Sequence, residues 1–256
     1  MSTMPGPMRM PRRVEPELLD LLPETDPRAI RSRRDLRRIN WAMATRSIVI
    51  RGIDASIHGR RPRRIVELGA GDGSLLLGLA RRRASQWPGV EATIVDRDDV
   101  VSPTVRASFA TLGWNVRIDS RDVFDWIDDT SANPYDLVFA NLFLHHFADN
   151  ALGRLLNGIA GRSNAFFACE PRRAAAALVG SHLVGLLGCN AVSRNDAVVS
   201  VHAGFCDREL TAAWPGKRSW RMDEYAAGLF SHCFVATRDL DGRDRDGDQR
   251  RQRKQI

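Results

Sequence analysis

Lysine is nearly absent from this chain of 256 residues, in which only Lys217 and Lys254 are lysines. The formal charge of +7 and the isoelectric point near 10 therefore come almost entirely from arginine. The arginines are spread along the chain among aspartates, whereas a phosphate-binding surface gathers its cations. A cluster at Arg31, Arg34 and Arg38 leaves a nucleic-acid partner open, but a solvated helix face is the favoured interpretation.

Cysteine pairs at a metal-binding spacing are also missing. The four cysteines, Cys169, Cys189, Cys206 and Cys233, are far apart and form no Cys-x-x-Cys motif. This spacing argues against a zinc site and against a disulfide framework. Free thiols suit a reducing cytoplasm, and residues 1–16 lack the apolar core of a secretory signal. We therefore expect a cytoplasmic protein that holds no metal.

Long apolar runs are scarce. Residues 174–192 carry no formal charge apart from His182, but Ser181, Asn190 and three glycines interrupt the run. A transmembrane helix needs about 20 predominantly apolar residues, so this segment is a weak candidate. We expect a buried or pocket-lining helix here instead.

The two ends of the chain differ in composition from its middle. Residues 1–25 are rich in proline, and residues 239–256 alternate Asp and Arg with almost no apolar side chain, so we expect both to be poorly ordered. The length between them suits one large domain over residues 26–238. Its expected parts are N-terminal helices over 26–60, a ligand-binding core over 64–170, and a terminal part over 171–238.

Strand-like apolar runs alternate with helical ones after the N-terminal helices, which is typical of a parallel sheet flanked by helices. Asp26-Pro27 marks a helix start, and helical patterns follow over 28–43 and 47–58. We expect a Rossmann-like, doubly wound α/β fold with a mostly parallel seven-stranded sheet and an antiparallel C-terminal strand pair. The predicted strands are 64–68, 91–95, 115–119, 135–140, 165–169, 220–222 and 231–237. The other predicted helices are 74–86, 103–112, 150–160 and 173–187.

A glycine-rich loop follows the first predicted strand. Residues Ile65 to Gly73 read Ile-Val-Glu-Leu-Gly-Ala-Gly-Asp-Gly, with three glycines at alternate positions before a helix. Glycine allows a tight turn and a close approach of backbone to ligand, although a turn without a ligand is the simpler interpretation. The dinucleotide fingerprint needs its third glycine one residue later, where this chain has Ser74, and this weakens a Rossmann dehydrogenase.

Two carboxylates near this loop favour a nucleoside ligand with an amine group and argue against a ligand with a pyrophosphate. Glu67 lies two residues before the first glycine, where it could accept hydrogen bonds from an ammonium group directly or through water. Asp96 ends the next strand, about where a ribose-binding acid is expected in this architecture.

The series Glu67-Leu-Gly-Ala-Gly-Asp-Gly73, Asp96 and Arg121-Asp122-Val123 resembles the motifs of class I S-adenosylmethionine-dependent methyltransferases of the small-molecule type. The resemblance covers residues 64–170 and implies S-adenosyl-L-methionine as cofactor. It implies that the glycine-rich loop holds the methionine part, Asp96 the ribose and Asp122 the adenine amino group. A helix cap is the alternative for Asp122. The implied cofactor-binding residues are Glu67, Gly69, Ala70, Gly71, Gly73, Asp96, Arg97, Asp122, Val123 and Asn141.

The segment after the fourth predicted strand is expected to face the ligand. In open α/β sheets ligands bind outside the carboxyl ends of the strands, so Asn141 to His146 should line the pocket. This segment resembles the Leu-His-His pattern of many small-molecule methyltransferases. A phenol or alcohol acceptor must lose its proton, and histidine is the commonest general base. His145 and His146 are therefore the candidate catalytic residues, with packing or capping as the alternative.

Residues beyond the fifth strand are candidates for acceptor binding. Glu170 and Arg172 lie where the chain leaves the sheet, and a solvated turn is an equal alternative for them. The segment 193–205 resembles the late insertions that shape the acceptor site in this superfamily. It makes Asp196 and His202 further candidates, with a capped surface helix as the alternative.

Four segments, 33–40, 141–147, 169–172 and 196–201, resemble bacterial methyltransferases associated with type III polyketide synthases. This resemblance implies O-methylation of a phenolic or polyketide-type, even lipid-tailed, acceptor, which the uncharged helix expected near 174–192 would suit. An RNA methyltransferase is the second hypothesis, although Asn141-Leu-Phe-Leu replaces the Asn/Asp-Pro-Pro-aromatic motif of base-directed enzymes. A non-catalytic binding module of the same fold is the third.

Overall fold

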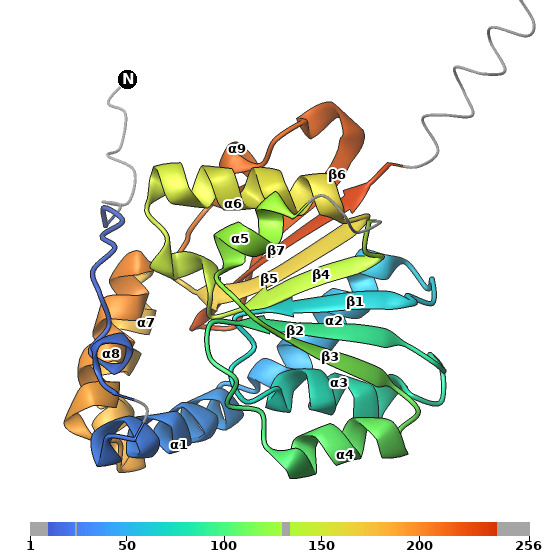
Figure 1. Ribbon diagram of the computed structural model, residues 1–256. Coiled ribbons are helices and arrows are strands. Elements are labelled where there is room, and N and C mark those ends of the chain that lie inside the picture. Colours follow the sequence, from blue (N-terminus) through green and yellow to red (C-terminus); the bar gives the residue numbers. More distant parts are fainter. Residues whose placement is uncertain (1–9, 24, 130–133, 240–256) are drawn as a thin grey trace, which may run out of the picture.

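Seven strands form one sheet in the order β3-β2-β1-β4-β5-β7-β6 (Figure 1). The computed structural model describes residues 10–23, 25–129 and 134–239. The first five strands are parallel, whereas β7 is antiparallel to both β5 and β6, so the predicted fold class is confirmed. The strands are β1 (Arg64–Leu68), β2 (Glu91–Asp96), β3 (Asn115–Ser120), β4 (Leu137–Asn141), β5 (Ala165–Pro171), β6 (Trp220–Ala227) and β7 (Ser231–Arg238).

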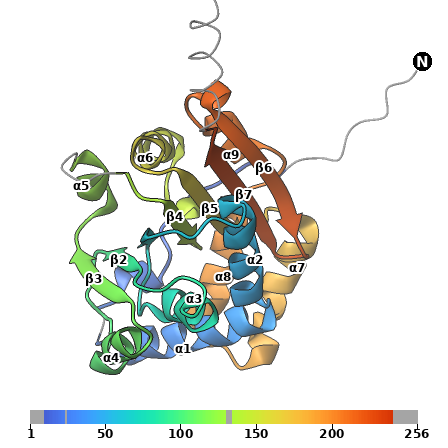
Figure 2. The ribbon, with the colours of Figure 1, turned by 90° about the vertical axis from the view of Figure 1, so that its right-hand side faces the viewer.

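Helices cover both faces of the sheet (Figure 2). The central strands β4 and β5 are almost wholly buried, which explains their continuous apolar sequences. One face packs against α2 (Thr45–Ile57), α3 (Ser74–Arg83) and α4 (Pro103–Thr111), and the other packs against α5 (Val123–Asp128), α6 (Asp149–Arg162) and α9 (Glu209–Ala213).

A third group of helices lies beyond the carboxyl ends of the parallel strands (Figure 1). It consists of α1 (Pro27–Ala42), α7 (Ala175–Leu183) and α8 (Ala191–Ala203), which contact one another. The Asp26 side chain caps α1 by accepting from Arg28 N at 2.8 Å, as the Asp-Pro pair predicted. The helix predicted over 173–187 is divided, because the chain tightens after α7 into the 3₁₀ turn η3 (Val184–Leu187). No helix in the described part of the chain is long and apolar enough to span a membrane.

Residues 10–23, named here the N-terminal segment, pack against this helical group although their composition predicted poor order. Arg12 donates to the carbonyl oxygens of Ala203 at 2.8 Å and Phe147 at 3.0 Å. Leu18 N and the N-terminus of the short turn η1 (Leu19–Leu21) donate to the Asp196 carboxylate at 2.8 and 3.0 Å. These bonds are polar contacts between residues far apart in the sequence. The segment has no apolar periodicity from which they could have been predicted. The predicted tail of residues 240–256 lies outside the described residues.

The strand β6 is longer than its predicted span of 220–222. All eight of its residues pair with β7, from Trp220 opposite Arg238 to Ala227 opposite Ser231. Alternate residues of β6 are exposed, because only one face of this edge strand is covered. The prediction relied on apolar residues, and β6 carries charged residues on its exposed face. Only the start of the strand was therefore predicted.

Gly52 allows α2 to lie directly on the sheet. A Cβ atom at this position would collide with the ring of Phe167 on β5, which is fully buried. The ring cannot move aside without disturbing the close-packed core around it.

The substitution Gly52→Ala should therefore lower the free energy of unfolding by about 1–3 kcal/mol, despite the better helix propensity of alanine. Gly153→Ala is the matched control, because a Cβ atom at that helical position meets nothing within 4 Å. Urea unfolding of the two variants and the wild type measures the difference. Equal destabilisation by both substitutions would contradict this account of the packing.

The Glu224 carboxylate links α9 to the terminal strand pair. It accepts hydrogen bonds from Leu210 N at 3.0 Å, Thr211 N at 2.7 Å and His232 Nε2 at 2.8 Å. Burial opposes ionisation of this carboxyl group, but the hydrogen bonds outweigh it and lower the pKa of Glu224. A carboxyl group with a lowered pKa stabilises the fold above its unfolded pKa and loses that contribution as the pH falls through its folded value.

Glu224→Gln should therefore destabilise the protein by about 1–3 kcal/mol at pH 7, with the difference from wild type shrinking below about pH 4. Unfolding curves at several pH values test this, with Asp223→Asn at the neighbouring exposed position as control. A difference that is constant from pH 7 to pH 3 would show that ionisation of Glu224 is not responsible.

Candidate active site

The glycine-rich loop joins β1 to α3 in a left-handed backbone. Gly69, Gly71 and Gly73 have φ of 64°, 52° and 70°, which favour glycine. Gly71 N donates to Asp96 Oδ2 at 2.8 Å, so the predicted ribose-binding acid is attached to this loop. A Cβ atom at Gly69 would collide with the ring of Phe143, whereas at Gly71 it would meet open space. The loop therefore combines a tight turn with a backbone that a ligand can approach.

Glu67 lies beneath this loop and is 2% exposed. Its Oε2 accepts a hydrogen bond from Leu76 N in the first turn of α3 at 3.2 Å. Burial raises the pKa of Glu67 well above its ordinary value, and the nearby Asp72 and Asp96 add to the effect. A proton donor or a cation at the loop would therefore stabilise the charged form of this side chain.

A cavity of about 620 Å³, named here the cofactor cavity, opens above the loop at the carboxyl ends of β1 and β2. Asp122 lies in its wall and also caps α5 by accepting from Phe124 N at 2.7 Å, so its two predicted roles coexist. Six of the predicted cofactor-binding residues line the cavity: Gly69, Gly71, Asp96, Arg97, Asp122 and Val123. The other four, Glu67, Ala70, Gly73 and Asn141, are not among its lining residues.

The chemistry of this region fits a nucleoside that carries an amine. The cavity combines the carboxylates of Asp96 and Asp122 with a wall of backbone from the glycine-rich loop. Asn141 Oδ1, at the end of β4, is buried and accepts no hydrogen bond from a described residue. Buried oxygens are nearly always paired, so this atom can accept from a ligand ammonium or hydroxyl group.

A second cavity of about 380 Å³, named here the apolar cavity, lies between α1, α7, η3 and α8. Its wall includes Ile39, Met43, Ala177, Val184 and Phe230. The charged residues Glu17 and Asp196 and three serines supply its polar groups: Ser181, Ser193 and Ser200. The cavity thus suits a mostly apolar molecule with few polar groups.

The two cavities share Leu142 in their walls. This residue follows β4 with φ of 53°, in the left-handed region that a leucine seldom adopts. Leu142 N donates to Cys169 O at 2.9 Å, which holds the turn against β5. The segment after β4 therefore lies between the two cavities. Of the residues expected to line a pocket, Leu142, Phe143 and His146 do so.

Glu170 holds this segment in place and is fully buried. Its Oε1 accepts from Phe143 N at 3.1 Å and Leu144 N at 2.9 Å, and its Oε2 lies 2.8 Å from His145 Nδ1. The predicted acceptor-binding residue is thus bonded to the backbone and to one of the two histidines, and it lines neither cavity.

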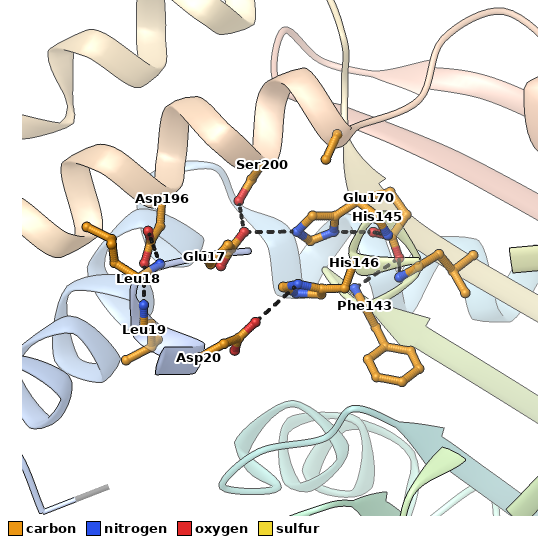
Figure 3. Close-up of polar contacts among 12 residues, drawn as sticks. Glu17, Leu18, Leu19, Asp20, Phe143, His145, His146, Glu170, Asp196 and Ser200 are labelled. Atoms are coloured by element: carbon orange, nitrogen blue, oxygen red, sulfur yellow. Dashed lines mark hydrogen bonds and ion pairs between the residues drawn. The ribbon is translucent and has the colours of Figure 1, made fainter. Parts of the chain in front are cut away.

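His145 lies between two carboxylates (Figure 3). Its Nδ1 faces Glu170, and its Nε2 lies 3.3 Å from Oε1 of Glu17. Burial would lower the pKa of His145, but the hydrogen bonds to these two glutamates raise it to about 9. The ring is therefore charged near neutral pH, with both nitrogens engaged. Conversely, the hydrogen bond and charge of His145 help to keep the pKa of the half-buried Glu17 below its ordinary value.

His146 differs from its neighbour because it lines the cofactor cavity. Its Nδ1 lies 3.6 Å from Oδ2 of Asp20, and the two histidine rings are 4.2 Å apart. Burial, together with the charge of His145, lowers the pKa of His146. This ring is therefore neutral at pH 7 and retains a lone pair.

The remaining predicted acceptor residues have different surroundings. Asp196 lines the apolar cavity, but its carboxylate is bonded to the backbone of Leu18 and Leu19, and burial raises its pKa. Arg172 Nη1 donates to Gly228 O at 3.3 Å in an exposed turn. His202 lines neither cavity, and its backbone oxygen accepts from Arg13 N at 3.1 Å.

The N-terminal segment was not predicted to contribute to the site. It supplies Glu17 to the apolar cavity, and Leu19 and Asp20 to the cofactor cavity. Acidic residues in a proline-rich stretch carry no periodic signal, so only the alternation of Glu15, Glu17 and Asp20 with apolar residues could have marked it.

Comparison with known proteins supports the assignment of the cofactor half. Residues 65–162 match the family model described as a methyltransferase domain. No curated protein sequence matches the chain.

Solved structures with similar folds include several methyltransferases. The plantazolicin methyltransferase BpumL, solved with S-adenosylhomocysteine (SAH), has a TM-score of 0.60 at 11% identity, over 84% of this chain and 91% of that one. An O-methyltransferase family protein from Burkholderia thailandensis has a TM-score of 0.54 at 18% identity, over 84% and 60%. A riboflavin-derivative dimethyltransferase from Streptomyces davawensis has a TM-score of 0.56 at 17% identity, over 87% and 62%.

The chain thus spans about three fifths of the last two proteins and nearly all of the first. Its glycine-rich loop and the matched family model lie in the same half of the sheet, and the likeness of fold extends over most of the described residues. Residues 65–162 therefore match a methyltransferase domain, and the chain shares its fold with these methyltransferases.

Proposed function

We propose that this protein transfers a methyl group from S-adenosylmethionine to an oxygen of a small phenolic or polyketide-type acceptor. The observation that carries the proposal is the pair of cavities that meet at Leu142, one polar and one apolar. A displacement reaction needs its two reactants held in line and shielded from water, and two adjoining cavities suit the first requirement. The similar structures named for plantazolicin and a riboflavin derivative also favour a small-molecule acceptor.

The cofactor supplies a methyl carbon on a sulfonium, which a nucleophilic oxygen can attack in line. Asp96 and Asp122 would accept hydrogen bonds from the ribose hydroxyls and the adenine amino group. The backbone at Gly69 and Gly71 would border the methionine part. Asn141 Oδ1 and the buried Glu67 are the two groups whose environment an ammonium group would improve, directly or through water.

The histidine pair would act at the acceptor end of this arrangement. His145 has carboxylates at both ring nitrogens, so we assign it a positioning role in place of the general-base role that its motif suggested. His146 retains a lone pair and lines the cofactor cavity beside Leu142 and Phe143. It is therefore the histidine of the pair whose lone pair is available at the junction of the two cavities.

The acceptor would enter the apolar cavity. The cavity is lined almost entirely by aliphatic side chains of α1, α7 and α8, together with Phe230. It lies where the uncharged sequence between residues 174 and 192 predicted a pocket-lining helix. An alkyl-bearing aromatic ring would bury its apolar surface there, with its hydroxyl group towards Glu17 and Leu142.

Asp96→Ala should weaken S-adenosylmethionine binding by at least about tenfold, because two cofactor hydroxyls would lose a charged acceptor. Asp122→Ala should weaken it by a similar factor. Calorimetric titration of the full chain measures both, with Asp223→Ala on the exposed edge strand as control. Failure of the folded wild-type protein to bind S-adenosylmethionine would contradict the assignment of this cavity.

Ala197→Trp should block the apolar cavity and lower kcat/KM for the acceptor at least about tenfold, while cofactor affinity stays unchanged, because a bulky ring would occupy the acceptor's volume. Alkylresorcinols of graded chain length are suitable probes, with methyl transfer followed by mass spectrometry. Ala212→Trp on the exposed surface of α9 is the control. Unchanged methylation in Ala197→Trp, or methylation of RNA in place of every small phenol, would contradict the proposed acceptor class.

A further inference from the structure

Three side chains from distant parts of the sequence form a cluster where the two cavities meet. Glu17, His145 and His146 each offer one ligand atom, and these atoms lie within 4.8 Å of one another. Glu17 lines the apolar cavity, His146 lines the cofactor cavity, and His145 lies between Glu17 and Glu170 (Figure 3). Two imidazoles and one carboxylate form a set that binds catalytic divalent metals in proteins.

Glu170 presents His145 to this cluster in a fixed orientation. Its carboxylate accepts from three backbone N–H groups and faces His145 Nδ1 at 2.8 Å, so Nδ1 carries the proton of that hydrogen bond. The other nitrogen, Nε2, then faces the Glu17 carboxylate. A lone pair and a carboxylate oxygen repel each other, so a positive charge must lie between them, either a proton or a metal cation.

The distance between His145 Nε2 and Glu17 Oε1 can be compared with the distances expected for a shared proton and for a shared cation. His145 Nε2 and Glu17 Oε1 are 3.3 Å apart, whereas charge-assisted hydrogen bonds of this kind are usually about 2.7–2.9 Å long. Two ligand atoms about 2.1 Å from one tetrahedral cation lie about 3.4 Å apart. The distance is therefore compatible with a cation held by both atoms.

Outer partners complete the arrangement. Metal-ligating histidines commonly donate their second ring nitrogen to a carboxylate, which fixes the ring and raises its basicity. Glu170 stands in this relation to His145, and Asp20 lies 3.6 Å from Nδ1 of His146. Ser200 Oγ donates to Glu17 Oε1 and holds the carboxylate at the cluster.

We propose that Glu17, His145 and His146 bind one divalent transition-metal cation, and that its remaining coordination positions face the junction of the two cavities. The cation displaces the proton between Glu17 and His145, and that proton is released to bulk water. It then takes the oxygen of the acceptor hydroxyl as a further ligand, and the hydroxyl proton leaves to water. As that oxygen forms its bond to the methyl carbon, the sulfur–carbon bond breaks and its electron pair stays on sulfur. The metal keeps its charge throughout, so no oxidant or reductant is needed.

Only the acceptor step rests on the proposed function, because the cation site is built from side chains alone. Binding is therefore tested without cofactor or acceptor, by titrating tag-free full-length protein with Co²⁺ and following its visible absorption and heat of binding. Failure of this titration would leave the proposed methyl transfer intact, since cofactor binding is measured separately.

We expect one Co²⁺ per chain, displaced by Zn²⁺, with affinity reduced at least about tenfold in Glu17→Gln and His146→Ala. Glu17→Gln is chosen because glutamine can still accept from Ser200 and keep the N-terminal segment in place. His182→Ala, at an exposed position of α7, should bind like the wild type. No binding, or equal binding by all four proteins, would overturn the proposal.

A measurement on the wild type avoids any dependence on the folding of variants. The chain contains six histidines, so spectra of protein labelled with ¹⁵N at histidine can follow each ring during a Zn²⁺ titration. We expect the signals of His145 and His146 to shift together while those of exposed His182 do not. Shifts confined to other histidines would overturn the site.

Discussion

The buried carboxylate of Glu170 is the constraint on which the rest of the site depends. It accepts from the backbone N–H groups after β4 and faces the ring of His145. Glu170 is fully buried, so water cannot replace its carboxylate as hydrogen-bond acceptor. Loss of the carboxylate would leave the backbone N–H groups unsatisfied and would destabilise the fold. The backbone at Phe143 and Leu144 and the orientation of His145 depend on this one group.

The parts of the site that sequence predicted are those built by neighbouring residues. The strand, the glycine-rich loop and the start of α3 form one continuous segment, and Asp96 and Asp122 follow at strand ends, where parallel topology brings them together. The sheet was predictable for the same reason, since strand and helix patterns alternate regularly. The edge strand β6 was underestimated most, because its exposed face is polar.

Contacts between distant segments could not be predicted in this way. Glu170 and Arg172 looked alike as charged residues at a strand end, yet Glu170 is buried beneath the β4 turn and Arg172 is half-buried and donates to the exposed residue Gly228. Glu17 is 128 residues from His145 along the chain and is delivered by an extended segment without apolar periodicity. Its burial depends on where Arg12 and the Asp196 carboxylate bind that segment, which is a property of the whole fold.

The antiparallel insertion of β7 has a consequence for synthesis of the chain. β5 is central and wholly buried, yet one of its edges is covered by the last strand, through seven pairs from Ala165 with Thr237 to Pro171 with Ser231. While the chain emerges from the ribosome, β5 therefore presents an unpaired apolar edge until residues 231–238 have been made. An edge of this kind invites pairing with other chains. Nascent chains that end between β5 and β7 would therefore be expected to bind a chaperone.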